Sequence, residues 1–329
     1  MKFLASLVAS ASFLTLSVCA QAPLHFKGGD GPGEGKHIVL IAGDEEYRSE
    51  EALPQLAKIL SEHHGFETSV LFSLNEKGEI APDANEHISS PETIDDADLL
   101  ILGLRFRQYS DEDMQHFQNA MDRAVPLIGL RTTTHAFKYD EDSKSPFKQY
   151  SFDSKEWEGG FGRQVMGETW VSHHGKHNIE GTRTVNVQSQ SSNPLLKGVG
   201  EIFGKTDVYG ANPPEDSLIL IDGAVTESIN EDSKIKDGPE NDPMQPIAWT
   251  RELPTDSGKV QRVFTTTMGS SQDLLDEDLR RLLVNAVYWG LKMEDKIPDK
   301  ANVEIVGNYE PTHFGFGTFK TGVKPSDLK

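Results

Sequence analysis

Short apolar segments alternate with amphipathic segments along this chain, and that alternation limits the folds it can adopt. Residues 37–43, 98–103 and 125–130 are apolar runs of the length that buried strands have. Between them, apolar residues recur at helical spacing from near Ser49 and Ser110. Because parallel strands need long crossovers, which helices provide, we predict an α/β fold with a mostly parallel sheet covered by helices on both faces. The residues expected on adjacent buried strands are Val39, Leu100 and Ile128.

Several residues indicate where these elements begin and end. Ser49 and Ser110 are candidate helix caps, and Gly65 is a candidate helix end. A turn-rich stretch at 254–259 separates two apolar runs and predicts a hairpin. Leucines and small residues at helical spacing over 275–290 predict a closing helix.

The first twenty residues are typical of a secretory signal peptide. Lys2 precedes an apolar stretch, and small residues at 18–20 suit cleavage. We therefore expect an exported protein, periplasmic or extracellular. Cys19 is the one cysteine, so the mature chain would have neither a disulfide nor a thiol nucleophile. The alternative is a lipoprotein anchored through Cys19, because residues 16–19 loosely resemble a lipidation motif.

The remaining chain divides into three parts. A Gly/Pro-rich flexible linker is expected at 21–36, one folded domain at 37–293 and an extended C-terminal arm at 294–329. The 329 residues include 32 basic and 52 acidic side chains, a formal charge of −20 at pH 7. Such a surface repels nucleic acid and anionic membranes, so neither is an expected partner. It also makes a local group of arginines informative.

Polar side chains follow each predicted strand at the point where the strand ends. Ligands of open parallel sheets bind outside the carboxyl ends of the strands, so these residues predict a site. Arg131 and His135 follow the third strand; alternatively, Arg131 forms a structural ion pair with Asp44 or Glu45. The other residues expected to bind substrate there are Glu45, Tyr47, Arg105, Arg107, Thr132 and Thr133.

A long irregular segment, 139–181, interrupts the alternation and predicts a functional loop. Its Glu168 is a candidate base. Its His173 and His174 are candidate ligands for zinc or manganese, and His177 is a further histidine in the same HHGKH stretch. We expect His173 or His174 to approach the strand-end arginines. Three later residues are expected to bind substrate, although Ser270 could equally cap a helix: Asp207, Tyr209 and Ser270.

The order of these elements resembles the ThuA-like (trehalose utilisation) family over about residues 37–293. The motifs that carry the resemblance are the GLRTTTH turn at 129–135, NPLLKG at 193–198, DVY at 207–209, PIAW at 246–249 and NAVYWG at 285–290. The resemblance implies a flavodoxin-like sheet of the class I glutamine amidotransferase kind. Arg131 stands where an amidotransferase has its nucleophilic cysteine, so thioester chemistry is excluded. Many ThuA-like sequences have histidine at the Arg131 position, and Gly-His where this chain has Gly269-Ser270.

The resemblance further implies work on disaccharides or on 3-keto-glycosides supplied by a partner sugar dehydrogenase. A base would remove the acidic hydrogen beside the keto group, and arginines would stabilise the enolate, so that a lyase or hydrolase reaction follows. The residues expected to be catalytic are Arg131, His135 and Glu168, with Arg105 as a second charge stabiliser. The alternative is a non-catalytic sugar-binding or scaffold protein that keeps the fold without the nucleophile.

Overall fold

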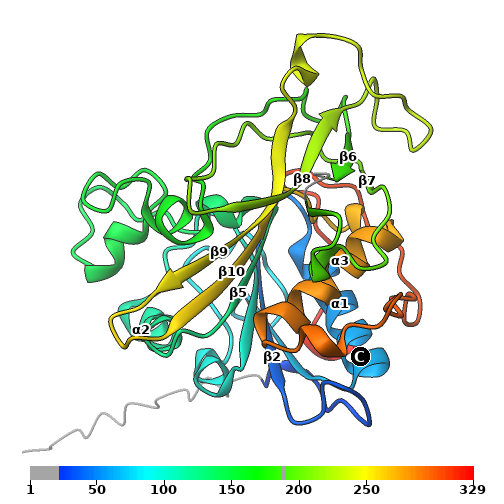
Figure 1. Cartoon of the computed structure of the whole chain (residues 1–329). Coiled ribbons are helices and arrows are strands. Elements are labelled where there is room, and N and C mark those ends of the chain that lie inside the picture. Colours follow the sequence, from blue (N-terminus) through cyan, green and yellow to red (C-terminus); the bar gives the residue numbers. More distant parts are fainter. Residues whose placement is uncertain (1–21, 187–189) are drawn as a thin grey trace, which may run out of the picture.

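A computed structural model describes residues 22–186 and 190–329 of the chain (Figure 1). The predicted signal peptide and Cys19 lie outside the described residues. Among the helices that are described, none has the length and apolarity needed to cross a membrane.

The core of the protein is one mixed β-sheet with the strand order β1-β3-β2-β4-β5-β10-β9-β8-β6-β7. Its centre, β3-β2-β4-β5-β10, is parallel, with β1 antiparallel at one edge and β9-β8-β6-β7 antiparallel at the other. The mostly parallel α/β sheet is thus confirmed for the central strands, which follow the flavodoxin-like order. The strands are β1 Leu24–Phe26, β2 His37–Gly43, β3 Glu67–Phe72, β4 Leu99–Leu104, β5 Leu127–Leu130, β6 Thr182–Asn186, β7 Phe203–Gly204, β8 Leu218–Val225, β9 Gln245–Pro254 and β10 Val260–Thr266.

The register of the central strands confirms their predicted neighbours. Val39 of β2 lies opposite Leu100 of β4, and Ile128 of β5 lies opposite Ile101 of β4. The predicted hairpin is also confirmed, because β9 and β10 pair antiparallel across the turn.

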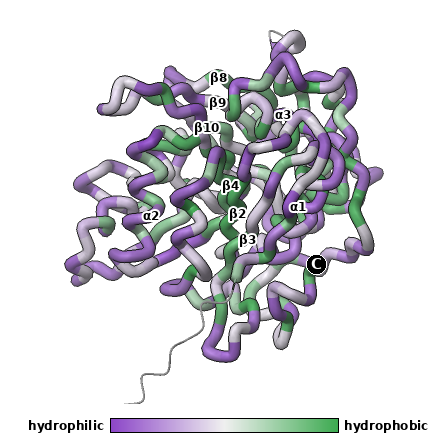
Figure 2. The backbone as a smooth tube through the Cα atoms, turned by 90° about the horizontal axis from the view of Figure 1, so that it is seen from below, coloured by the Kyte–Doolittle hydropathy of each residue, from purple (hydrophilic) through white to green (hydrophobic). Residues whose placement is uncertain are grey.

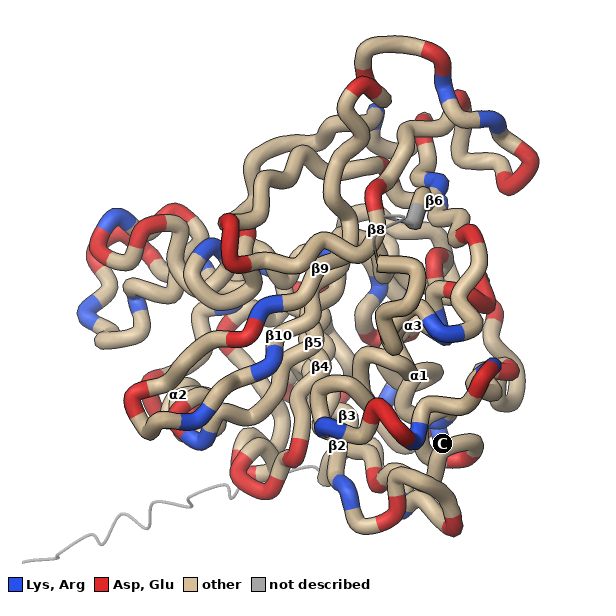
Figure 3. The backbone as a smooth tube through the Cα atoms, in the orientation of Figure 1, with Lys and Arg blue, Asp and Glu red and all other residues tan. Residues whose placement is uncertain are grey.

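Helices cover both faces of the sheet, as predicted (Figure 1). Helices α1 (Ser49–His64) and α3 (Glu277–Gly290) lie on one face, and α2 (Asp111–Asp122) lies on the other, which the view along the sheet in Figure 2 also shows. Strand side chains point alternately to the two faces. Ile38 and Leu40 of β2 therefore join the α1–α3 core, whereas Val39 joins the α2 core. Because both faces are buried, β2, β4 and β5 are almost entirely apolar and contain no Lys, Arg, Asp or Glu, and Figure 3 shows few charged residues along these strands.

One of the two predicted helix caps is confirmed. Ser110 caps α2, since its Oγ accepts a hydrogen bond from the Asp113 amide at 3.1 Å. Ser49 does not cap α1, which begins at Ser49 itself and ends at Gly65 as predicted. Its Oγ instead accepts from the Asp44 amide at 3.0 Å and so fixes the turn that follows β2.

The two ends of the described chain both contact the domain. Leu24–Phe26, in the stretch expected to be a flexible linker, instead forms β1, and Leu24 is buried in the core. The expectation is therefore wrong for these three residues. The segment 294–329 contains two short 3-10 helices, Glu294–Lys296 and Pro325–Leu328, and no strand. It crosses α1, where the Thr312 amide donates to Glu51, and reaches the end of β2.

Candidate functional site

The turn after β5 presents Arg131 at the carboxyl edge of the parallel strands. Arg131 has a left-handed backbone (φ 42°) and opens the short 3-10 helix Arg131–His135. In α/β-hydrolases a sharp strand-to-helix turn exposes the nucleophile, and in this protein such a turn holds an arginine. Thr132 and Thr133 are fully buried and donate to the Asp44 carboxylate and to the Leu102 carbonyl. They fasten the turn to its neighbours, so their predicted role in binding substrate is not supported.

The Arg131 side chain is enclosed by the protein and has 1% of its surface exposed. Nη1 donates to the carbonyls of Asp207 (2.7 Å) and Thr267 (2.8 Å), and Nη2 donates to Asp207 Oδ1 (2.9 Å). The guanidinium also lies between the rings of Tyr47 and Tyr209, 4.5 and 3.7 Å from their centroids. Arg131 therefore does not point into an open cleft. Its ion-pair partner is neither Asp44 nor Glu45 but Asp207, which it holds in place.

Asp207 is the centre of the cluster. It is fully buried, and its Oδ2 lies 2.7 Å from His173 Nδ1 while its Oδ1 lies 3.2 Å from His177 Nδ1. Burial alone would raise the pKa of this carboxyl, but Arg131 and the two histidines hold it well below its usual range. Asp207 is therefore an anion at neutral pH, and it anchors two imidazoles that each keep part of their surface in solvent.

Three residues of this cluster fit a divalent cation. One ligand atom each from His173, His177 and Asp207 lies within 4.8 Å of the others. Two imidazoles and a carboxylate suit zinc or manganese. We call these three residues, with Arg131, the strand-end cluster.

Of the two predicted metal ligands, one lies at the strand-end cluster and the other does not. His173 approaches the strand-end arginine through Asp207, as expected. His174 does not, because its Nε2 contacts the Glu240 carbonyl at 2.6 Å. His173 forms a β-bridge with Tyr209, and neighbouring residues of an extended chain point to opposite sides. His177, four residues after His173, takes the place expected for His174; the HHGKH stretch contained that signal.

The residues after β2 and β4 form a second layer of ion pairs. Glu45 accepts from Arg105 Nη1 at 2.6 Å and from Arg107 Nη2 at 2.9 Å. Arg107 is fully buried and also donates to the Pro82 carbonyl, so it is internal to the fold. Arg105 keeps partial exposure and lies between the rings of Phe106 (4.3 Å) and Phe316 (4.9 Å). Of this group, Arg105 is therefore the better candidate to contact a ligand.

Glu46 and Tyr47 connect this layer to the strand-end cluster. Glu46 lies 3.6 Å from His177 Nε2, and burial raises the pKa of its carboxyl. Tyr47 accepts from Arg131 at 3.2 Å and from the Tyr209 hydroxyl at 3.3 Å. Burial raises the pKa of Tyr47 to about 12, so its hydroxyl stays protonated at neutral pH.

His135 lies beside the cluster in an aromatic environment. Its ring is 5.1 Å from Phe106, 6.0 Å from Trp170 and 6.4 Å from Tyr209, centroid to centroid. Burial, followed by the charges of Arg105 and Arg131, lowers the pKa of this imidazole well below its ordinary value. His135 is thus neutral at neutral pH, and burial disfavours its protonated form.

Glu168 and Ser270 serve the fold. Glu168 Oε1 accepts from Arg163 (3.0 Å) and from the Thr169 amide (2.9 Å), and its Oε2 accepts from the Asn212 amide (2.6 Å). Its oxygens are thus occupied in holding the loop, which does not support the predicted role as a base. Ser270 is fully buried and its Oγ accepts from the Asp273 amide, so it fastens the turn before the 3-10 helix Asp273–Leu275 without being that helix's N-cap residue.

Aromatic residues of the C-terminal arm were not predicted at the site. Phe314 packs on Tyr47 and His177, with centroids 5.3 and 5.7 Å apart, and Phe316 is 57% exposed beside Arg105. The arm has no hydrophobic periodicity, so no pattern in the sequence indicated where these rings would lie.

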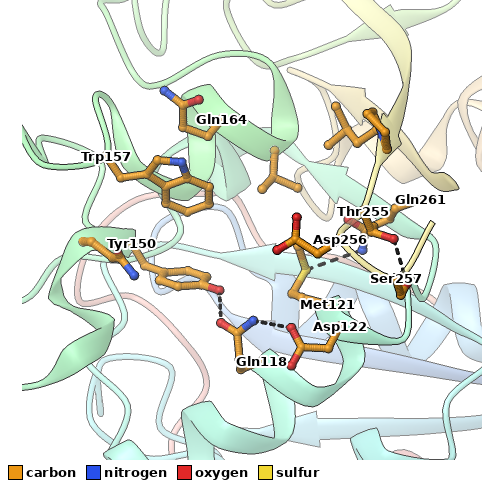
Figure 4. Close-up of a pocket in the computed structure, with 14 residues that line it drawn as sticks. Gln118, Met121, Asp122, Tyr150, Trp157, Gln164, Thr255, Asp256, Ser257 and Gln261 are labelled. Atoms are coloured by element: carbon orange, nitrogen blue, oxygen red, sulfur yellow. Dashed lines mark hydrogen bonds between the residues drawn. The ribbon is translucent and has the colours of Figure 1, made fainter. Parts of the chain in front are cut away.

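A surface cavity of about 930 Å³ lies elsewhere, between α2, the 149–165 segment and the β9–β10 turn (Figure 4). Its lining includes Tyr150, which donates to Gln118, but no histidine or arginine. It shares no residue with the strand-end cluster. We place the candidate site at the cluster because groups able to bind a cation or move a proton converge there.

Comparison with known proteins supports one family. The family model described as "Trehalose utilisation" (ThuA) matches residues 38–290. No curated protein matches the sequence. A ThuA-like protein from Bacteroides uniformis has 12% identity and a TM-score of 0.44, covering 79% of this chain and 92% of that one. A second, from Parabacteroides merdae, has 14% identity and a TM-score of 0.43, covering 89% and 99%. PurLQS from Thermotoga maritima has 12% identity and a TM-score of 0.38, covering 77% and 98%. Because the family model spans most of the chain, the protein belongs to the ThuA (trehalose utilisation) family.

Proposed function

We propose that the protein is an exported enzyme that processes disaccharides or their 3-keto-glycoside forms by enolate-type elimination or by hydrolysis. The observation that carries the proposal is the buried Asp207 anion, bound by Arg131 on one side and by His173 and His177 on the other. Membership of a carbohydrate-utilisation family supports the substrate class.

His173 is the proposed base. With its Nδ1 proton held by Asp207 at 2.7 Å, Nε2 is left to accept a proton from the substrate, and Asp207 stabilises the imidazolium that forms. In a 3-keto-glycoside the C2–H bond breaks, its electron pair forms the C1=C2 bond, and the C1–O bond to the leaving group breaks. The departing oxygen takes a proton, which the imidazolium can return. Arg131 is then a positioning residue, and His135 is a second candidate base.

A divalent cation offers an alternative to His173 as the base, because the neutral imidazole has one lone pair and cannot both bind a metal and accept a proton. His173, His177 and Asp207 would hold it. When bound, zinc or manganese would polarise a carbonyl oxygen or acidify a water molecule. Whether turnover depends on the metal separates a metal-assisted reaction from one driven by the His173–Asp207 pair alone.

The aromatic surroundings support a sugar as the ligand. Phe106 and Phe316 flank Arg105, and Trp170 lies 6.0 Å from His173, centroid to centroid. Such rings pack against the apolar faces of sugars while a cation binds hydroxyl or carbonyl oxygen. The same rings favour the alternative function, a non-catalytic sugar-binding protein. A partner sugar dehydrogenase would supply the keto group.

The decisive experiment incubates the purified protein with glycosides and with their 3-keto forms, after chelation and again with added zinc or manganese. We expect turnover of a 3-keto form, its loss in His173→Ala, and its retention in His174→Ala. The last variant is a matched control, since His174 is the adjacent histidine and points away to Glu240. Saturable binding without turnover under every metal condition would favour the binding protein. If the protein shows no binding and no turnover, both functions are refuted.

A further inference from the structure

A second group of histidines lies at the opposite end of the sheet. His25, His37 and Glu67 come from β1, β2 and β3, and β3 lies between the other two strands. His25 is paired with Ser69, and His37 is paired with Glu67. Residues opposite each other, and residues two apart on one strand, share a face of a sheet. All four side chains therefore project from the same face; we call them the edge cluster.

Ser69 aligns the two imidazoles. Its Oγ lies 3.1 Å from His25 Nδ1 and 2.9 Å from His37 Nε2, and a hydroxyl can donate to one ring while it accepts from the other. His25 Nε2 lies 3.7 Å from Glu67 Oε1. One ligand atom each from His25, His37 and Glu67 lies within 4.8 Å of the others. Three potential ligands thus converge on one point from three adjacent strands.

We propose that the edge cluster is a second cation site, which binds a zinc-class divalent ion through His25, His37 and Glu67. Two imidazoles and one carboxylate are a donor set that zinc, nickel and copper prefer, whereas magnesium and calcium favour oxygen ligands throughout. Water would complete the coordination, because His25 and Glu67 are both nearly half exposed.

The environment of His37 suits a metal ligand. Its ring belongs to the convergent set with Glu67, and its backbone amide donates to Asp98 Oδ2 at 2.9 Å, so two carboxylates lie close to it. Those carboxylates also attract a cation. The seven residues of β2 separate the edge cluster from the strand-end cluster by about 20 Å, at 3.3 Å a residue, so the two sites are distinct.

The expected consequence is structural. Strand β1 has three residues and pairs with β3 alone, and so short an edge strand is weakly held. A cation shared by His25, Glu67 and His37 would tie β1 to its neighbour β3 and to β2 beyond it. Because only the folded chain brings these ligands together, binding would raise the thermal midpoint of unfolding.

The test begins with a variant that lacks the strand-end histidines, His173→Ala/His177→Ala. We expect it to bind one equivalent of Zn²⁺ in competition with a chromophoric chelator, to give a Co²⁺ spectrum typical of nitrogen and oxygen ligands, and to gain thermal stability on zinc addition. Adding His37→Ala, or the more conservative Glu67→Gln, should weaken binding at least about 100-fold and remove the gain. Circular dichroism of each variant checks the fold independently.

A matched control uses His116, whose Nδ1 lies 2.8 Å from Asp95 Oδ2 in an exposed histidine–carboxylate pair without a second imidazole. His116→Ala should leave zinc binding unchanged. The proposal is overturned if the background variant binds no zinc, or if removal of His25 or His37 leaves the affinity unchanged. If instead the wild type binds one equivalent and His173→Ala/His177→Ala does not reduce it, the edge site stands and the metal at the strand-end cluster is refuted.

Discussion

The strand-end cluster and the edge cluster contain the same kinds of side chain in different surroundings. Each has two histidines and one carboxylate whose ligand atoms converge within 4.8 Å. Asp207 of the strand-end cluster is fully buried and paired with an arginine, whereas Glu67 of the edge cluster is 45% exposed. A buried anion needs a fixed partner, and an exposed one is solvated by water. Loss of the carboxylate charge should therefore cost much stability at the strand-end cluster and little at the edge cluster when no metal is bound.

The largest expected difference follows from removing each carboxylate charge. Asp207→Asn leaves the Arg131 guanidinium buried without its counter-ion and should destabilise the protein by about 3–5 kcal/mol. Glu67→Gln should change stability by less than about 0.5 kcal/mol without metal. Urea unfolding of both variants measures the contrast. Equal effects would contradict the distinction between the clusters.

Arg131→Lys should have a smaller effect, about 1–3 kcal/mol, because it keeps the charge but loses the fork that binds the Asp207 and Thr267 carbonyls. Arg131→Met should destabilise the protein more than Arg131→Lys, since it also leaves the Asp207 anion buried without its counter-ion. If the role of Arg131 is positioning, turnover should fall in both variants while the affinity for a sugar changes little. Full activity in a normally folded Arg131→Met protein would show that catalysis does not need the Arg131–Asp207 pair.

Stability should also depend on pH through His135, which is buried beside the strand-end cluster. The folded-state pKa of His135 is lowered, so its contribution is present above the unfolded value of about 6.5 and is lost as pH falls below it. The loss is about 1.4 kcal/mol per pH unit for one such group. His135→Gln should therefore flatten the stability profile between about pH 6.5 and 5. An unchanged slope in urea titrations would show that His135 does not titrate as proposed.

Asp207 should also make the protein less stable as pH falls, but in a more acidic range than His135. Its folded pKa is depressed, so its stabilisation is present above the unfolded value of about 3.9 and is lost as pH falls toward the folded value. Asp207→Asn should remove this acid limb, while Glu67→Gln should leave it in place.

The smallest expected change in stability is at Phe316. The side chain is 57% exposed, so Phe316→Ala should alter the free energy of unfolding by less than about 0.5 kcal/mol. If its ring and Arg105 form part of a sugar site, ligand affinity should nevertheless fall about fivefold, equivalent to about 1 kcal/mol. Val260→Ala is the control, because Val260 is also exposed but begins β10, at the opposite end of the parallel strands. Equal affinities in the two variants would remove the arm from the site.

Local patterns predicted most of the central fold and part of the site. Continuous apolar runs predicted β2, β4 and β5, because strands buried on both faces need them. The position of Arg131 after β5 predicted that it would lie at the ligand-binding edge. Short strands escaped prediction: β1 has three residues, and its pairing with β3 depends on a partner about forty residues away.

The sequence by itself determined the alternating strands and helices, the edge where charges collect and the absence of a thiol at the turn after β5. Each follows from residue type or from spacing of a few positions along the chain. Only the tertiary structure decided which of those charges is buried and with what partner. Arg131 meets Asp207 across 76 positions, and His173 meets it across 34, because separate segments fold back to the same strand ends. Two opposite charges that are both buried must pair, because an unpaired buried charge is strongly destabilising. Arg131, which its place after β5 predicted to contact a ligand, therefore holds the Asp207 carboxylate instead.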